Sequence, residues 1–233
     1  MDESTMKSGG AAKDSANPKK AAKTKAHGVG RPRQDDVEDR LENLMNTALK
    51  LFLEHGYGNV SLETIAKAAH VAVRTIYVKF GGKIGLLSAA ITMNREQAFA
   101  GLLNMEDDDR PLPEVLLDFG KRFLGIVMTE RAGHLQRIVF AEAKRSPDMA
   151  TAFYNAGPIQ TRQMLTRYFA REDVRAQLRE DLSVDTLTGH FLGCLSGDIF
   201  VRLVMVVRDM SNQEIRERAE LAVSLFLSGA RRQ

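Results

Sequence analysis

Apolar residues recur every three or four positions along most of the chain, which is the period of an amphipathic α-helix. The pattern predicts a first helix over residues 35–55, a second over residues 62–69 and a third over residues 73–80. Ser61 is a suitable N-cap for the second helix. No stretch alternates between apolar and polar residues over the length of a β-strand. The pattern therefore predicts an all-α fold.

Beyond Gly81 and Gly82 the helical period continues almost to the C-terminus. The predicted helices cover residues 83–104, 114–129, 133–145, 148–169, 184–207 and 212–228. Residues 106–113, with the sequence EDDDRPLP, predict a loop. Pro158 follows Gly157 inside one of these helices, and because proline lacks an amide hydrogen we expect a kink there. A larger helical domain thus follows a small three-helix unit.

The third predicted helix has one apolar and one polar face. The apolar face, which would pack on the first two helices, consists of Val73, Ile76 and Phe80. The outward face consists of Arg74, Thr75, Val78 and Lys79, with Tyr77 at the border. Only residues 70–72 separate this helix from the second one. Such a pair predicts a helix-turn-helix, a motif whose second helix lies in the major groove of DNA.

The polar face has the chemistry for contacts with duplex DNA. Arg74 can offer two donors to a guanine edge. Tyr77 and Lys79 suit phosphates, which position a protein on DNA, and Lys83 begins a helix whose unpaired N–H groups favour an anion. The predicted DNA-contacting residues of this unit are Ser61, Arg74, Thr75, Tyr77, Lys79 and Lys83. The alternative is an ordinary solvated helix face.

Positive charge is concentrated near the N-terminus. The net charge of the 233 residues is +3, but residues 1–33 hold eight Lys or Arg against three Asp or Glu, and the remainder holds 25 against 27. Such asymmetry suggests binding to nucleic acid or to an acidic surface. Residues 1–30 contain almost nothing large and apolar, so we predict a disordered basic arm, or alternatively a solvated tail without a role.

The chain lacks the motifs of several other functional classes. It has no Gly-x-Ser-x-Gly elbow and no Gly-rich phosphate loop, and its five histidines form no His-x-x-x-His pair. We therefore predict no enzymatic activity, no metal and no cofactor. The single Cys194 fits a reducing cytosol, and the lack of an apolar leader or an 18-residue apolar run predicts a cytoplasmic protein without a membrane partner.

Residues 30–91 combine several short motifs in a defined order. These are Gly30-Arg31-Pro32-Arg33, Leu51-Phe52, Gly56-Tyr57, Ile65-Ala66, Val71, Thr75-Ile76-Tyr77, Phe80 and Lys83. With this order and spacing, the segment resembles the N-terminal DNA-binding domain of TetR-family transcriptional regulators. The resemblance implies a helix-turn-helix domain over residues 31–82. It also implies that Arg31 and Arg33 reach toward the minor groove or the DNA backbone.

Two positions depart from the family pattern. His70 stands where the family often has a glycine that closes the turn, and Ala72 stands where it usually has a Ser or Thr that caps the recognition helix. Histidine tolerates a left-handed backbone better than most residues, but at a cost relative to glycine. A missing cap costs about 1 kcal/mol. We therefore expect a family-like turn with a weakened start of the third helix.

The rest of the chain resembles a second domain of the same family. Residues 137–158, with the sequence RIVFAEAKRSPDMATAFYNAGP, are similar to the C-terminal domain of the AefR-like subgroup. The resemblance implies that residues 83–233 form a helical domain, with about nine helices, that binds a small molecule and dimerises. The candidate pocket residues are Phe99, Phe119, Phe123, His134, Phe140 and Phe153. Alternatively, these residues are plain core.

Three glycines predict a close helix contact near the C-terminus. They are spaced every four residues, and each costs up to about 1 kcal/mol relative to alanine inside a helix. Such a ridge is useful where another backbone approaches, so we predict a four-helix dimer interface. Its predicted residues are Gly189, Gly193, Leu195, Gly197, Ala222 and Phe226. A close crossing within one chain is the alternative.

The resemblance implies a homodimeric, sequence-specific transcriptional regulator. In this interpretation it represses transcription from a palindromic operator, and a small-molecule ligand releases it. Two alternatives stay open. One is an architectural or non-ligand-gated DNA-binding protein, and the other is an enzyme with a catalytic residue in a helical cavity.

Overall fold

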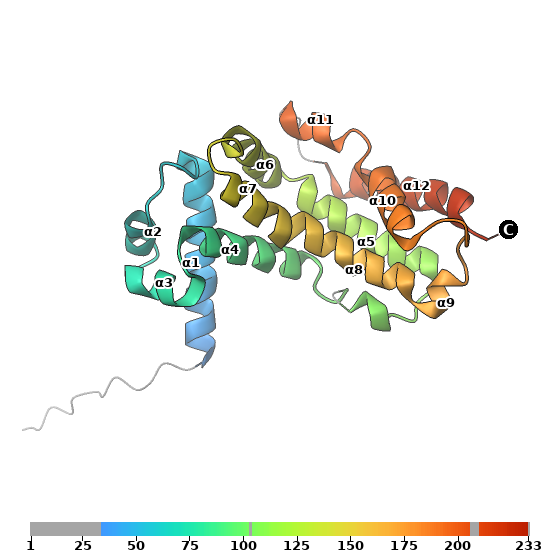
Figure 1. The fold of residues 1–233 in the computed structure, drawn as a ribbon, viewed down its shortest axis with the longest axis horizontal. Helices are drawn as coiled ribbons and strands as arrows, with labels where there is room; N and C mark the ends of the chain where they lie inside the picture. Colours follow the sequence, from blue (N-terminus) through green and yellow to red (C-terminus); the bar gives the residue numbers. More distant parts are fainter. Residues whose placement is uncertain (1–33, 103, 206–209, 233) are drawn as a thin grey trace, which may run out of the picture. The chain divides into compact units, whose positions relative to one another are not determined.

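The computed structural model describes residues 34–102, 104–205 and 210–232. The predicted arm over residues 1–30, together with Arg31 and Arg33, lies outside the described residues. The described residues form one compact unit by their contacts. Within the described residues the chain is helical and has no strand, apart from one isolated bridge between Leu178 and Arg231 (Figure 1). The predicted all-α fold is confirmed.

The first three helices form a small head whose buried core also includes side chains from later helices. They are α1 (Gln34–His55), α2 (Leu62–Ala68) and α3 (Val73–Phe80). The Ser61 hydroxyl caps α2 by accepting a hydrogen bond from the Thr64 amide at 3.1 Å. The buried side chains that join these helices include Leu44, Ala48, Phe52, Ile65, Ala66 and Ile76. The three predicted helices are therefore present, with bounds within one residue of those expected.

The turn between α2 and α3 has the two features that its sequence predicts, a left-handed residue and a helix start without a side-chain cap. His70 adopts a left-handed backbone with φ of 55°. Ala72 is the N-cap of α3 and offers no side-chain hydrogen bond to the first turn. The turn is closed instead by the backbone, because the Val71 amide donates to the Ala66 carbonyl at 2.9 Å. The head keeps the helix-turn-helix geometry without the usual side-chain cap.

The remaining helices complete the core of the head and surround a second core. They are α4 (Lys83–Ala98), η1 (Met105–Asp107), α5 (Leu112–Val127), α6 (Glu130–Glu142), α7 (Pro147–Tyr154), η2 (Asn155–Ile159), α8 (Gln160–Ala170), α9 (Glu172–Arg175), α10 (Val184–Ser196), α11 (Ile199–Val204) and α12 (Asn212–Ala230). The irregularity expected at Pro158 is present, because η2 is a short π-helical segment between α7 and α8. Within the described residues no single helix is long and apolar enough to cross a membrane. The pair α3 and α4 reaches that limit by length and composition only, and the two helices are bent by 68° relative to each other.

Two predicted helices end early because arginines from other helices bind their last carbonyls. The helix predicted over residues 83–104 ends at Ala98, where Arg122 of α5 donates to the carbonyls of Ala98 and Ala100 at 3.2 and 2.6 Å. A charged donor at a helix C-terminus satisfies carbonyls that have no partner within the helix. The helix α4 therefore ends at Ala98, and the chain turns toward η1.

The helix predicted over residues 184–207 is broken at Gly197. This glycine has φ of 45°, which ends α10, and the chain resumes as α11. Arg218 of α12 donates to the carbonyl of Leu195 at 2.9 Å and to that of Ser196 at 2.8 Å. Its guanidinium also pairs with Asp198 at 2.9 Å. The prediction of one continuous helix is wrong because this contact from α12 stabilises the break.

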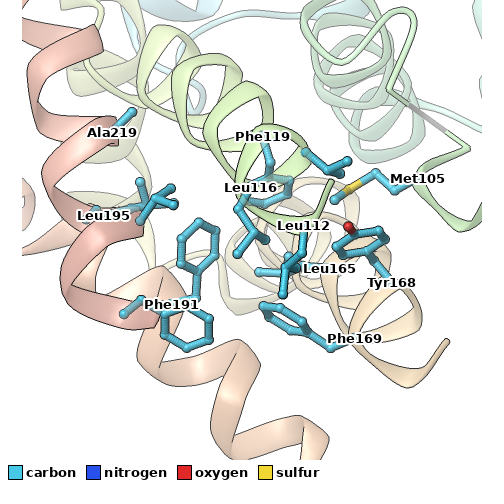
Figure 2. Close-up of a cluster of buried hydrophobic side chains, with 14 of the residues drawn as sticks. Met105, Leu112, Leu116, Phe119, Leu165, Tyr168, Phe169, Phe191, Leu195 and Ala219 are labelled. Carbon is cyan, nitrogen blue, oxygen red and sulfur yellow. The ribbon is translucent and has the colours of Figure 1, made fainter. Parts of the chain in front are cut away.

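Aromatic side chains from four helices form the centre of the second core (Figure 2). The ring of Phe191 on α10 lies 6.0 Å from Phe119 on α5, 6.2 Å from Phe169 on α8 and 5.0 Å from Phe226 on α12. Leu195 and Ala219 lie beside this cluster. Rings at such spacings add about 0.5–1.5 kcal/mol per pair beyond the area that they bury. This cluster joins α5, α8, α10 and α12 into one bundle.

Gly120 of α5 lies close to side chains of α10 and α12. A Cβ at this position would lie 3.0 Å from Cδ2 of Leu195 and 3.3 Å from the Cβ of Ala219. We expect Gly120→Val to lower the free energy of unfolding by about 1–3 kcal/mol, because overpacking forces neighbouring groups to move. Gly125→Val is the matched control on α5, since nothing described lies within 4 Å of its Cβ position. Urea denaturation checks this, and equal stabilities of the two variants would contradict the packing.

Candidate nucleic-acid interface and cavity

The recognition helix α3 has the two faces that its sequence predicts. Ile76 is fully buried in the head, whereas Tyr77 and Val78 are 57% and 70% exposed. Arg74 and Lys79 are also exposed. Buried Ile76 therefore fixes the orientation of the helix, and the polar side chains point away from the core of the head.

The outward face is basic. The sequence of α3 contains no acidic residue, and Arg74 and Lys79 both project from it. Lys67, near the end of α2, is a further exposed cation beside the turn. Thr75 is half-buried, and its amide donates to the Ala72 carbonyl at 2.9 Å. This arrangement suits the negative potential of a DNA groove.

The side chains of Ser61 and Lys83 make contacts within the protein, with Thr64 and Tyr57. The Ser61 hydroxyl is exposed but lies 3.1 Å from the amide and 3.1 Å from the hydroxyl of Thr64. The Lys83 ammonium donates to the Tyr57 carbonyl and lies 4.2 Å from the centre of the Tyr57 ring. Burial lowers the pKa of Lys83. Lys83 therefore differs from the prediction, because its half-buried side chain is directed toward Tyr57 rather than toward the outward face.

Replacing Lys83 tests whether this residue contacts DNA phosphate or stabilises the head through Tyr57. We expect Lys83→Met to lower the free energy of unfolding by about 1 kcal/mol, because a cation–π contact and a hydrogen bond are lost. The salt dependence of DNA binding should stay unchanged. Lys79→Met is the matched control, and it should reduce the slope of log K against log salt by about 0.9. If the slope falls for Lys83→Met as well, Lys83 contacts phosphate after all.

A partly open cavity of about 420 Å³ lies among α1, α4, α5, α6, α7, η2, α8, α10 and α11. Its wall is mostly apolar and includes Leu49 of α1, Ile91 of α4 and Ile126 of α5. Cavities of this size accommodate drug-sized molecules. Two of the predicted pocket residues, Phe123 and Phe153, line it.

The other four predicted pocket residues lie elsewhere. Phe99 and Phe119 are fully buried in the second core, where their ring centres lie 5.4 Å apart. His134 and Phe140 are exposed on α6. Aromatic residues at helical spacing do not distinguish a cavity wall from a filled core. The polar cavity residue Arg95, by contrast, lies four residues after buried Ile91, and this spacing could have revealed it.

The predicted dimer residues have three different environments. Leu195, Ala222 and Phe226 are buried inside the subunit, so they differ from the prediction and are not presented to a partner. Gly197 forms the break after α10, and the Cβ position of Gly189 lies 3.6 Å from Nη1 of Arg162. Gly193 is exposed, with nothing described within 4 Å of its Cβ position. Of this set, Gly193 alone combines an exposed position with open space around it in the described structure.

Two exposed leucines form an apolar stripe on α12. Leu221 and Leu225 are 60% and 59% exposed, although they lie one turn apart on a helix whose opposite face is buried. On α10, exposed Cys194 follows Gly193. Sequence periodicity locates the apolar positions of α12 but does not distinguish a face buried within a subunit from one left for a partner.

Two family models match this chain. Residues 44–90 match the model described as bacterial regulatory proteins of the tetR family, and residues 114–229 match that of the AefR-like transcriptional repressor C-terminal domain. The chain belongs to the TetR family of transcriptional regulators. In this TetR-family regulator, α2 and α3 form the DNA-binding helix-turn-helix, and the chain acts in transcription rather than as an enzyme.

Individual relatives of this TetR-family chain agree with the assignment. The regulator UidR of Escherichia coli K12 is 22% identical over 82% of this chain and 92% of its own length. The flavonoid-responsive regulator FrrA has a similar structure, with a TM-score of 0.66 and 26% identity over 84% of this chain and 99% of its own. NalD, the secondary repressor of the MexAB-OprM efflux pump in Pseudomonas aeruginosa, has a TM-score of 0.54 and 21% identity over 85% of this chain and 100% of its own.

Proposed function

We propose that this TetR-family regulator is a homodimeric repressor that binds a palindromic operator and is released by a small-molecule ligand. The observation that carries the DNA-binding part is the exposed basic face of α3, held outward by buried Ile76. The repressor role is supported by the AefR-like repressor model over residues 114–229. A protein with this function acts in the cytoplasm, where the chromosome lies.

Each residue of the outward face has a defined role in this proposal. Arg74, in the first turn of α3, donates to the O6 and N7 atoms of a guanine. Thr75 contacts a neighbouring base or phosphate. Tyr77 and Lys79 bind phosphates and so fix the register of the helix in the groove. We further propose that Arg31 and Arg33 contact the DNA backbone or the minor groove.

Dimerisation supplies the second recognition helix. Each head carries one α3, so a palindromic site requires two heads related by a two-fold axis. We propose that the exposed apolar stripe of Leu221 and Leu225, together with Gly193 and Cys194, packs against its symmetry mate. Small Gly193 lets the backbones of two α10 helices approach closely. The revised interface is thus the outer surface of α10 and α12, not their buried faces.

The cavity provides a route by which a ligand affects the head. Leu49 belongs to α1 of the head and Ile91 to α4, which directly follows α3, yet both line the cavity. A ligand that fits better when these helices are displaced shifts the population toward heads with the wrong spacing for DNA. FrrA, which is named as flavonoid-responsive, is a relative with a small-molecule effector.

Selection of bound DNA from a random pool tests the proposal. The full chain should enrich an inverted repeat whose half-site centres lie about 34–36 Å apart, or a multiple of that distance. An enriched pool without a consensus would instead support an architectural DNA-binding protein. Enrichment of a single unrepeated half-site would contradict the dimer.

A further inference from the structure

The cavity has an unbalanced charge. Among the described residues that line it there are two arginines, Arg95 and Arg131, and no Asp or Glu. The other polar lining residues are neutral, and the rest of the wall is apolar. A mostly apolar cavity with a few polar groups fixes the orientation of its ligand through those groups. The only full charges that this wall offers a ligand are therefore positive.

Arg95 is the buried member of this pair. Its side chain is 14% exposed, whereas Arg131 is exposed. The Nε atom of Arg95 is buried and has no hydrogen-bond partner among the described residues. Its Nη2 atom lies 3.5 Å from the carboxylate of Glu96, which is itself 52% exposed. A guanidinium nitrogen left without an acceptor in such a site is costly, and a bound acceptor would remove that cost.

We propose that the effector is an amphipathic organic anion. Its apolar body occupies the cavity, and its anionic group, such as a carboxylate, sulfonate or phenolate, accepts hydrogen bonds from Arg95. Charge-assisted hydrogen bonds of this kind are about twice as strong as neutral ones. The release of DNA by this effector rests on the proposed function, whereas the preference of the cavity for an anion does not.

The position of Arg95 connects ligand charge to the DNA-binding head. Arg95 lies one turn after Ile91 on α4, and α4 begins at Lys83, immediately after α3. Gly157 of η2 contacts the same part of α4, since its Cβ position lies 3.3 Å from Cγ2 of Ile91. An anion that draws Arg95 toward the cavity therefore acts on the helix that supports the recognition helix.

Two dyes with nearly the same apolar body test the preference of the cavity. These are 8-anilinonaphthalene-1-sulfonate and N-phenyl-1-naphthylamine, which lacks the sulfonate. Fluorescence titration of the full chain should give at least tenfold tighter binding for the sulfonate dye, as expected for a hydrogen bond to a charged group. Equal affinities, or tighter binding of the neutral dye, would overturn the proposal.

Variants assign the preference to Arg95. Arg95→Met should lower the affinity for the sulfonate dye at least tenfold and change the affinity for the neutral dye less than threefold. Arg95→Lys should keep most of the preference for the sulfonate dye. Arg145→Met, an exposed arginine outside the cavity wall, is the matched control and should change both affinities less than threefold. A larger loss in Arg131→Met than in Arg95→Met would contradict the assignment. Ala132→Leu narrows the cavity and should lower the affinity for both dyes. If neither affinity changes, the dyes bind elsewhere and the proposal is overturned.

The DNA arm of the experiment separates this inference from the proposed function. The sulfonate dye should release the wild-type chain from its selected operator, and the Arg95→Met chain should need at least tenfold more dye. If the dye preference holds but no DNA is bound or released, the cavity chemistry stands and the ligand-gated repressor fails. If DNA is bound and the dye preference is absent, the repressor stands and the anionic effector is wrong.

Discussion

Replacing Arg74 with alanine is expected to lower the affinity for the selected operator by roughly tenfold to a hundredfold. Arg74 lies in the first turn of α3 on its exposed face, where a guanidinium can bind a guanine edge through two hydrogen bonds. Each such pair contributes about 1–3 kcal/mol of discrimination. The variant should therefore also lose its preference at one base pair of each half-site. Fluorescence anisotropy with operators substituted at single positions measures both effects.

Lys50→Ala is the matched control for the Arg74 variant. Lys50 is an exposed cation of the same head, on α1, and its ammonium lies 3.8 Å from Glu54. Its removal changes the net charge by the same amount but should lower operator affinity less than threefold, because a single distant charge is screened by salt. Equal losses in the two variants would mean that Arg74 contributes only general electrostatic attraction. If Arg74→Ala binds the operator with undiminished affinity, Arg74 does not contact a base.

Placing aspartates at Leu221 and Leu225 is expected to convert the dimer into monomers. Both side chains are more than half exposed on α12, and in the proposed interface the new carboxylates would be buried without partners. Binding of two linked heads far exceeds that of one, so operator affinity should fall more than a hundredfold. Sedimentation velocity measures the oligomeric state, and anisotropy measures DNA binding.

Tyr154→Asp is the control for the interface variant. Tyr154 is 54% exposed on α7, so an aspartate there introduces one negative charge, against two in the interface variant, at a similarly exposed large side chain. This chain should stay dimeric and bind its operator normally. A double variant at Leu221 and Leu225 that is still dimeric would place the interface elsewhere. In that case another exposed apolar site, such as Val201 on α11, becomes the next candidate.

Helix starts were more predictable from the sequence than helix ends. Ser61 caps α2 through a contact three residues away, and Ser211 forms a capping box with Glu214 in the same local way. The ends of α4 and α10 depend instead on Arg122 and Arg218, which come from helices distant in the sequence. A local hydrophobic pattern contains no information about such contacts.

The same distinction between local and distant contacts applies to the candidate sites. The two faces of α3 follow from its own periodicity, so Arg74 and Lys79 could be placed on the exposed side in advance. The inward position of Lys83 depends on the carbonyl and ring of Tyr57, 26 residues earlier in the chain. Which aromatic residues line the cavity depends on how the middle helices pack. These sites therefore required the tertiary structure.

Methylation interference on the selected operator tests the central claim most directly, because methyl groups on guanine N7 block the major groove. The account predicts that methylation prevents binding in two groove segments about 34–36 Å apart, or a multiple of that distance. In each half-site one guanine should lose its effect when Arg74 is replaced by alanine. Binding that tolerates methylation at every guanine N7, or that is blocked in one segment only, would contradict a dimer that reads DNA through α3.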